Sequence, residues 1–165
     1  MKKILLPFVI VLTMISCTKA QKTAFSKEAL ENKLVALDGS EVAFKDILEK
    51  YKGKTLVIEA WASWCGDCVK AMPKIKELQD NNPDVAYLFI SADKTAGKWK
   101  AGIEKHNLQG DHYLIKDGMK GAFGKSIALD WIPRYIIIDK TGKIVVYRAI
   151  ETDFEKINST LTSLK

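Results

Sequence analysis

Two cysteines with two residues between them, Cys65 and Cys68, are the side chains in this sequence best suited to chemistry. They follow a nearly continuous apolar run over 55–62 and open a stretch of helical periodicity that reaches about residue 80. The first N–H groups of a helix carry partial positive charge, which favours a thiolate over a thiol. We therefore expect Cys65, at the open helix end, to be a nucleophile. Cys68, one turn further in, is placed to attack the resulting mixed disulfide.

Metal binding and simple cross-linking are the alternative uses of such a pair. A zinc site needs further ligands, and the sequence has no second cysteine pair of this spacing. The two histidines, His106 and His112, lie far along the chain and not at ligand spacing. A disulfide that closes so small a loop restrains the unfolded chain very little, which argues against an inert staple. Redox exchange is the interpretation that the residues favour.

Two acidic residues near the cysteines are expected to influence them. Glu59 interrupts the apolar run, and burial of a carboxylate is costly unless it is paired or protonated, so burial would raise its pKa. An edge-facing or lysine-paired glutamate is the alternative. Asp67 lies between the sulfurs, where its charge would oppose ionisation of Cys65. It is also a favourable residue for the first turn of a helix.

Strands alternate with helices in the first part of the chain, and a hairpin followed by a helix closes it. This order predicts an α/β fold with a mixed sheet, in which residues 94–117 form an αβ excursion between the two halves. The expected strands are 34–37, 42–44, 55–62, 85–90, 113–115, 134–139 and 144–148, and the expected helices are 45–51, 65–80, 94–106, 118–125 and 154–164.

The N-terminus has the pattern of an export signal. A basic start precedes an apolar run over 4–15, which is too short to span a bilayer comfortably. Cys17 follows a small residue at the end of this run, as in a bacterial lipobox, where the cysteine becomes the lipidated first residue. We predict a lipoprotein signal peptide over 1–16, a lipidated start and tether over 17–32, and one domain over 33–165. In the alternative, Cys17 is an ordinary residue of a signal peptide.

The charge pattern argues against nucleic acid as a partner. The 165 residues carry a formal net charge of +6, but lysines are scattered among acids, and no dense basic block with interleaved aromatics is present. Hydrophobic content of 47% and charged content of 28% are ordinary for a soluble globular domain.

Two segments carry a family resemblance. Residues 59–68, followed by Pro73, resemble the thioredoxin active-site segment, and residues 131–145 resemble the second thioredoxin landmark. The excursion between the halves and the lipoprotein-like start are similar to the TlpA/ResA branch. The resemblance covers about residues 33–164. It implies the thioredoxin fold, a central mixed β-sheet flanked by helices, with an αβ insertion between the two halves.

The resemblance also implies roles for residues beyond the redox-active Cys65–Cys68 disulfide. Pro133 would follow a cis peptide bond and face the disulfide. The backbone of Ile132 would pair with an extended substrate segment, while its side chain shields the sulfurs from metal. Trp64 would line the substrate groove.

Acid–base chemistry is the remaining role that the resemblance assigns. Glu59 occupies the place of the buried acid that exchanges protons with the second cysteine. The glutamate that ResA-type proteins carry three residues after that cysteine is replaced by Ala71. Gly66 and Asp67 would modulate the pair, and we hypothesise that Asp67 tempers the acidity of Cys65 and favours a moderately reducing pair.

These observations predict a thiol–disulfide oxidoreductase of the bacterial cell envelope, facing the periplasm and anchored to a membrane by lipid. The resemblance implies the reducing direction. Its partners would be protein thiols and disulfides and a membrane or thioredoxin-like electron donor, and no cofactor or metal is expected. The alternative is a metal- or haem-assembly binding protein that uses the same cysteines. A thiol peroxidase would carry threonine at the position of Ala62. The last alternative is a structural partner domain that keeps the cysteine motif but catalyses no exchange.

Overall fold

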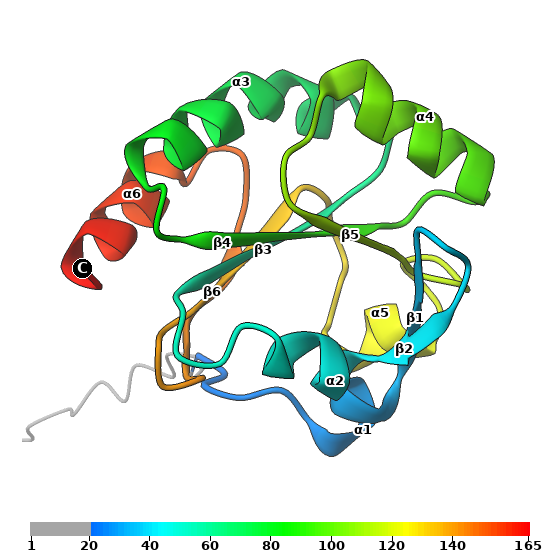
Figure 1. Cartoon of the computed structure of the whole chain (residues 1–165), viewed down its shortest axis with the longest axis horizontal. Helices are drawn as coiled ribbons and strands as arrows, with labels where there is room; N and C mark the ends of the chain where they lie inside the picture. Colours follow the sequence, from blue (N-terminus) through cyan, green and yellow to red (C-terminus); the bar gives the residue numbers. More distant parts are fainter. Residues whose placement is uncertain (1–20) are drawn as a thin grey trace, which may run out of the picture.

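The computed structural model describes residues 21–165, which form one mixed sheet with helices on both faces (Figure 1). The predicted signal peptide over 1–16 and the predicted lipidation site Cys17 lie outside the described residues. The strands are β1 (Lys33–Ala36), β2 (Glu41–Ala43), β3 (Leu56–Trp61), β4 (Ala86–Ser91), β5 (Asp111–Leu114), β6 (Arg134–Ile138) and β7 (Ile144–Ala149). The helices are α1 (Lys27–Glu31), α2 (Phe44–Glu49), α3 (Gly66–Asn81), α4 (Ala96–His106), α5 (Ala122–Ser126) and α6 (Phe154–Ser163).

Strand β3 lies inside the sheet, whose order is β2-β1-β5-β4-β3-β6-β7. It pairs in parallel with β4 and antiparallel with β6. All six of its residues are buried, which explains its nearly unbroken apolar sequence. Helices α3, α4 and α6 cover one face of the sheet, and α1, α2 and α5 cover the other (Figure 1). This arrangement confirms the predicted thioredoxin fold.

The excursion predicted over 94–117 consists of α4 and β5. Strand β5 pairs in parallel with β4 and antiparallel with β1, so it inserts between the β1–β2 hairpin and the rest of the sheet. The same insertion places α4 on the face that α3 covers (Figure 1). The inserted helix is therefore a neighbour of the helix that begins at the cysteines.

Part of the segment expected to be a tether is packed against the domain. Ser26 caps α1 by accepting a hydrogen bond from the backbone of Ala29, which is fully buried. The ring of Phe25 packs edge-on against Phe44, with 4.9 Å between the centroids. The packed body thus begins before the predicted boundary at residue 33. The sequence pattern missed α1 because five residues with one buried side chain leave no clear periodicity.

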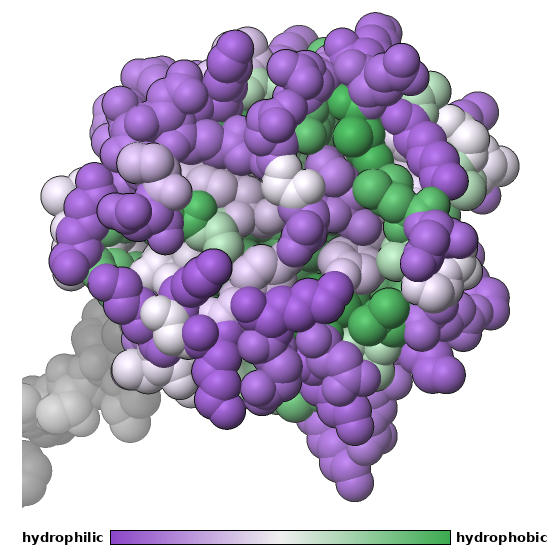
Figure 2. All heavy atoms as spheres, in the orientation of Figure 1, coloured by the Kyte–Doolittle hydropathy of each residue, from purple (hydrophilic) through white to green (hydrophobic). Residues whose placement is uncertain are grey.

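The exterior is mostly hydrophilic in the view of Figure 2, with small apolar patches between hydrophilic residues. Among the helices of residues 21–165, none combines the length and the apolar character needed to cross a bilayer.

Candidate functional site

Cys65 and Cys68 form a disulfide at the N-terminus of α3, with 5.3 Å between their Cα atoms. Cys65 is the N-cap, in extended conformation, and its Sγ accepts the backbone N–H of Cys68 at 3.1 Å. Cys65 is 7% exposed, whereas Cys68 is fully buried. The outer sulfur is therefore the one that a substrate can reach. A thiolate at Cys65 would receive the same N–H bond and the favourable field of the helix end.

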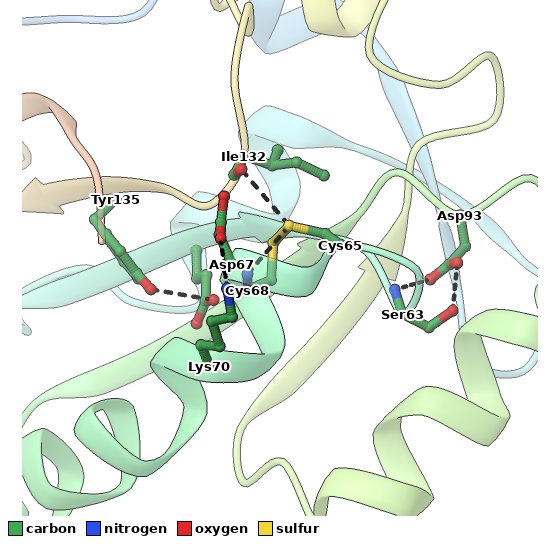
Figure 3. The surroundings of a disulfide bond; sticks show 9 residues. Ser63, Cys65, Asp67, Cys68, Lys70, Asp93, Ile132 and Tyr135 are labelled. Carbon is green, nitrogen blue, oxygen red and sulfur yellow. Dashed lines mark hydrogen bonds and ion pairs between the residues drawn. A yellow bond between two sulfur atoms is a disulfide. The ribbon is translucent and has the colours of Figure 1, made fainter. Parts of the chain in front are cut away.

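The loop between α5 and β6 closes over this sulfur. The Ile132–Pro133 peptide bond is cis, in agreement with the family resemblance. The carbonyl oxygen of Ile132 lies 3.6 Å from Sγ of Cys65 (Figure 3). Both Ile132 and Pro133 are buried, and the backbone carbonyl of Ile132 is the group that approaches the disulfide.

Two exposed tryptophans flank this contact. Trp64, which precedes Cys65, is 59% exposed, and Trp131, which precedes Ile132, is 53% exposed. Large indole rings are seldom left this open, and exposed aromatic residues are enriched at protein-binding surfaces. The family resemblance implies that Trp64 lines the substrate groove, but it gives Trp131 no role. Its position next to the Ile132–Pro133 pair was the available signal.

Glu59 is buried in the layer between the sheet and α3. Only 3% of it is exposed, and burial raises the pKa of its carboxyl to about 8, while a hydrogen bond from Tyr135 acts in the opposite direction. Side chains alternate along a strand, so Glu59 points to the same face as Trp61, which packs against Gly102 of α4. Glu59 is thus neither at a sheet edge nor paired with a lysine, and sequence reasoning missed its partner Tyr135.

A buried aspartate holds the turn that leads into Cys65. The carboxylate of Asp93 accepts hydrogen bonds from the backbone N–H of Ser63 at 3.0 Å and from its hydroxyl at 2.7 Å (Figure 3). The hydroxyl of Ser91 donates to the same carboxylate at 2.8 Å. Asp93 therefore ties the turn after β3 to the end of β4. No local pattern around Ser63 indicates this contact, because the partners are thirty residues apart.

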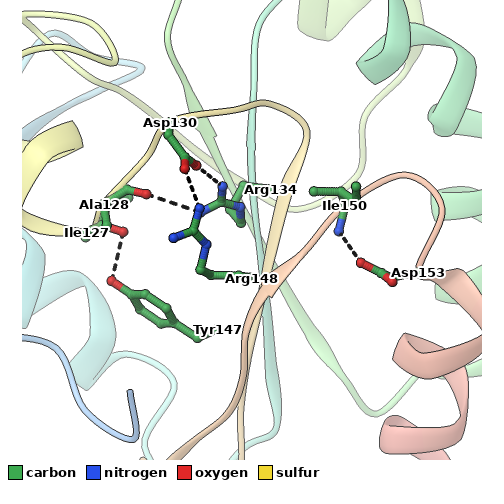
Figure 4. Close-up of polar contacts among 8 residues, drawn as sticks. All are labelled: Ile127, Ala128, Asp130, Arg134, Tyr147, Arg148, Ile150 and Asp153. Atoms are coloured by element: carbon green, nitrogen blue, oxygen red, sulfur yellow. Dashed lines mark hydrogen bonds and ion pairs between the residues drawn. The ribbon is translucent and has the colours of Figure 1, made fainter. Parts of the chain in front are cut away.

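An arginine pair fixes the opposite loop (Figure 4). Arg134 is buried and donates to the carbonyl of Ala128 at 3.3 Å and to the carboxylate of Asp130, which also accepts from Arg148. These bonds hold the pKa of the Asp130 carboxyl below its usual value, and the bond from Arg134 has the largest effect. The loop that presents Trp131 to the solvent is therefore anchored on both sides of that residue.

The two residues between the cysteines have different surroundings. Asp67 forms an ion pair with Lys70 one turn on, at 3.6 Å, with the Lys70 side chain in solvent and that of Asp67 partly exposed (Figure 3). Such a pair contributes little to stability, but it offsets part of the negative charge near the disulfide. At Gly66, an added Cβ would meet no atom within 4 Å, so packing does not demand glycine there.

The described residues include no cluster of three or more histidine, cysteine, aspartate or glutamate side chains that could hold a metal ion. His112 is stacked on Phe89 in the sheet, with 5.2 Å between ring centroids, and its Nε2 bonds to the carbonyl of Leu108. It belongs to the packing of β4 and β5.

Comparison with known proteins supplies independent information. The Redoxin family profile matches residues 16–163. The chain is 27% identical over 159 residues to the thiol-disulfide oxidoreductase ResA of Bacillus thuringiensis, covering 88% of each protein. It is 30% identical over 129 residues to ResA of Bacillus anthracis, covering 76% of this chain and 69% of that one. A crystal structure from Bacteroides vulgatus, described as a candidate thiol-disulfide oxidoreductase, superposes with a TM-score of 0.66 at 28% identity, over 88% of this chain and 100% of the other.

Proposed function

This chain belongs to the Redoxin family, as a thioredoxin-like thiol–disulfide oxidoreductase of TlpA/ResA type, and from that premise we propose that it reduces disulfides in proteins of the bacterial cell envelope. The unequal burial of the two sulfurs is the observation that carries this proposal. Cys65 keeps 7% exposure beside the Ile132 carbonyl, whereas Cys68 is fully buried. A pair arranged in this way offers one sulfur to a protein substrate and keeps the other for resolution.

In the first step, the Cys65 thiolate attacks one sulfur of the substrate disulfide. A mixed disulfide forms between Cys65 and the substrate, and the other substrate sulfur leaves as a thiolate that takes a proton from water. The backbone N–H of Cys68 and the dipole of α3 favour the attacking thiolate.

In the second step, Glu59 acts as the base for Cys68. The Glu59 carboxylate takes the Cys68 thiol proton, and the new thiolate attacks Sγ of Cys65. The Cys65–Cys68 disulfide closes, and the second substrate sulfur leaves and is protonated. A carboxyl with a pKa of about 8 is well matched to a thiol, because proton transfer is most effective between groups of similar pKa.

The substrate would bind as an extended segment across the loop of Ile132 and Pro133. Backbone groups of Ile132 would pair with it in the manner of strand addition. Trp64 and Trp131, which precede Cys65 and Ile132 in the sequence, are exposed and would offer apolar area to residues that flank the substrate cysteine. Rigid aromatic side chains provide such contacts at low entropic cost.

Reduction of substrates requires an electron donor for this protein and a moderate affinity of the Cys65–Cys68 pair for electrons. Two electrons and two protons from the dithiol of a membrane or thioredoxin-like donor would reopen the Cys65–Cys68 bond after each cycle. Asp67 would oppose ionisation of Cys65, and its ion pair with Lys70 would limit that effect. Gly66 would keep the segment between the sulfurs free of side-chain contacts.

The envelope location rests on the N-terminal sequence. A signal peptide over 1–16 would export the chain, and lipid on Cys17 would hold the domain at a membrane facing the periplasm. Mass spectrometry of the protein from bacterial membranes tests this part: a lipid-modified Cys17 as first residue supports it, and an unmodified mature N-terminus contradicts it.

A trapping experiment tests the exchange and its partners. In Cys68→Ser, Cys65 can attack a substrate but the mixed disulfide cannot resolve. We expect covalent adducts with envelope proteins that dithiothreitol releases, and the Cys65→Ser/Cys68→Ser double variant is the matched control. No adducts above that control would contradict the proposal.

The direction is tested separately. Reduced protein should reduce a disulfide-bonded substrate captured in the trap faster than oxidised protein oxidises the same substrate in its dithiol form. The opposite order of rates would contradict a reductase.

A further inference from the structure

The hydroxyl of Tyr135 is the one side-chain hydrogen-bond donor that the described part of the chain offers to Glu59. The two residues are register partners in the antiparallel pair β3–β6, so their side chains emerge on the same face of the sheet. The hydroxyl donates to Oε1 of Glu59 at 3.4 Å, and both residues are buried. In Figure 3 the Tyr135 side chain extends from β6 toward the first turn of α3.

We propose that Tyr135 is a positioning residue for thiol–disulfide exchange, whose hydroxyl orients the Glu59 carboxyl and favours the ionised form that accepts the Cys68 proton. This inference rests on the proposed role of Glu59 as the base of the resolving step. With Oε1 occupied by Tyr135, the second carboxylate oxygen remains for the thiol proton.

Tyr135 is suited to act as a permanent donor. Burial raises the pKa of its hydroxyl, and the negative charges of Glu59 and Glu151 raise that pKa further, so the proton stays on the oxygen. A neutral O–H donor stabilises a carboxylate more than a carboxylic acid. The bond therefore opposes the effect of burial on the pKa of Glu59 and keeps it near that of a thiol.

The hydrogen bond from Tyr135 is the main polar contact of the Glu59 carboxyl among the groups around it. Its register partner on β4 is Phe89, and the ring of Phe154 on α6 packs edge-on against Tyr135 at 5.3 Å. Titratable or charged groups on the elements packed around this layer include Cys68 and Lys74 of α3, Tyr87 of β4, His112 of β5, Asp93 after β4 and Glu151 after β7. The Tyr87 hydroxyl donates to the Leu78 carbonyl, and Nε2 of His112 bonds to the Leu108 carbonyl. Lys74 is turned to the ring of Phe154, and Asp93 is engaged by Ser63.

The direct test is the titration of the Glu59 carboxyl carbon by NMR in Tyr135→Phe. The oxidised protein is used because disulfide-bonded cysteines do not titrate, and Glu59→Gln assigns the resonance. We expect the midpoint to move upward by about half a pH unit or more, the value of one modest hydrogen bond. Tyr147→Phe is the matched control, since this buried hydroxyl donates to the Ile127 carbonyl at 2.8 Å. An unchanged midpoint, or an equal shift in the control, overturns the inference.

The kinetic test follows the resolving step itself. The reduced protein is mixed with a chromogenic aromatic disulfide, and release of the second aromatic thiolate reports attack of Cys68 on the mixed disulfide. Near neutral pH, a base whose pKa is half a unit higher is ionised about threefold less often, so Tyr135→Phe should resolve about threefold more slowly. In a Glu59→Gln background the tyrosine substitution should add no further pH effect, and an additional shift there overturns the inference.

The failures of the two proposals are distinguishable. If Glu59→Gln leaves the pH profile of resolution unchanged, the role of Glu59 is wrong and the role of Tyr135 falls with it, whereas adducts in the Cys68→Ser trap still support exchange. If Tyr135→Phe does not fold, site-specific 3-fluorotyrosine at position 135 keeps the ring and strengthens the donor. It should move the Glu59 midpoint downward, and no movement overturns the inference.

Discussion

Replacing Glu59 with glutamine should stabilise the oxidised protein at neutral pH. The Glu59 carboxyl has a pKa of about 8 when folded, against an ordinary value of 4.5. Below 4.5 both states hold the proton, and the carboxyl has no effect on the pH dependence of stability. Between the two values the folded state keeps a proton that the unfolded state has lost, so stability falls as pH rises. Glutamine is similar in shape and never ionises.

The size of the effect follows from the two pKa values. Each pH unit between them costs about 1.4 kcal/mol of unfolding free energy. Neutral pH is roughly two and a half units above 4.5, which corresponds to about 3 kcal/mol, and the loss approaches about 5 kcal/mol near pH 8. Glu59→Gln should recover most of this difference, while its side-chain oxygen still accepts the Tyr135 hydroxyl.

Urea unfolding of the oxidised proteins at several pH values between about 5 and 8 measures this effect. The stability advantage of Glu59→Gln over wild type should grow steadily with pH across that range. Glu77→Gln, which removes the same charge from an exposed position of α3, is the control and should track wild type. An advantage that does not change with pH would refute the assignment of a buried, protonated Glu59.

Further predictions concern the packing and the charges around the disulfide. An added Cβ at Gly102 would lie 2.7 Å from Cβ of Ser63, so Gly102→Ala should be about 1–3 kcal/mol less stable in urea than Gly97→Ala, whose Cβ meets nothing within 4 Å in the same helix. Equal stabilities would show that α4 does not press on the active-site turn. Asp67→Asn should lower the pKa of the Cys65 thiol by about a few tenths of a unit, and Lys70→Ala should raise it, as measured by the pH dependence of alkylation. Shifts of the same sign in both variants would contradict the charge argument.

Elements with strong local patterns were predictable from the sequence. The apolar run over 55–62 indicated the buried strand β3, and the alternation of strands and helices indicated the mixed sheet with its α4–β5 insertion. The paired cysteines and the Ile132–Pro133 dipeptide pointed to a site at which two distant segments meet, and the 3.6 Å approach of the Ile132 carbonyl to Cys65 agrees with that expectation.

Contacts that depend on strand register were not predictable. Tyr135 meets Glu59 only because β6 pairs with β3 in one of several possible registers, and nothing near Tyr135 in the sequence marks that choice. The bond from Ser63 to Asp93 likewise joins the ends of two strands that become neighbours only in the folded sheet. Sequence patterns report burial and periodicity, whereas these contacts arise from tertiary pairing.

Reversible opening of the Cys65–Cys68 bond is the property on which the proposed function depends. The most direct measurement is a redox titration with dithiothreitol, in which free thiols are alkylated at each step and counted by mass spectrometry. We expect one two-electron transition, in which both cysteines gain the label together at potentials that physiological dithiols reach. A bond that such dithiols cannot open, or a pair that never closes, would contradict thiol–disulfide exchange at this site.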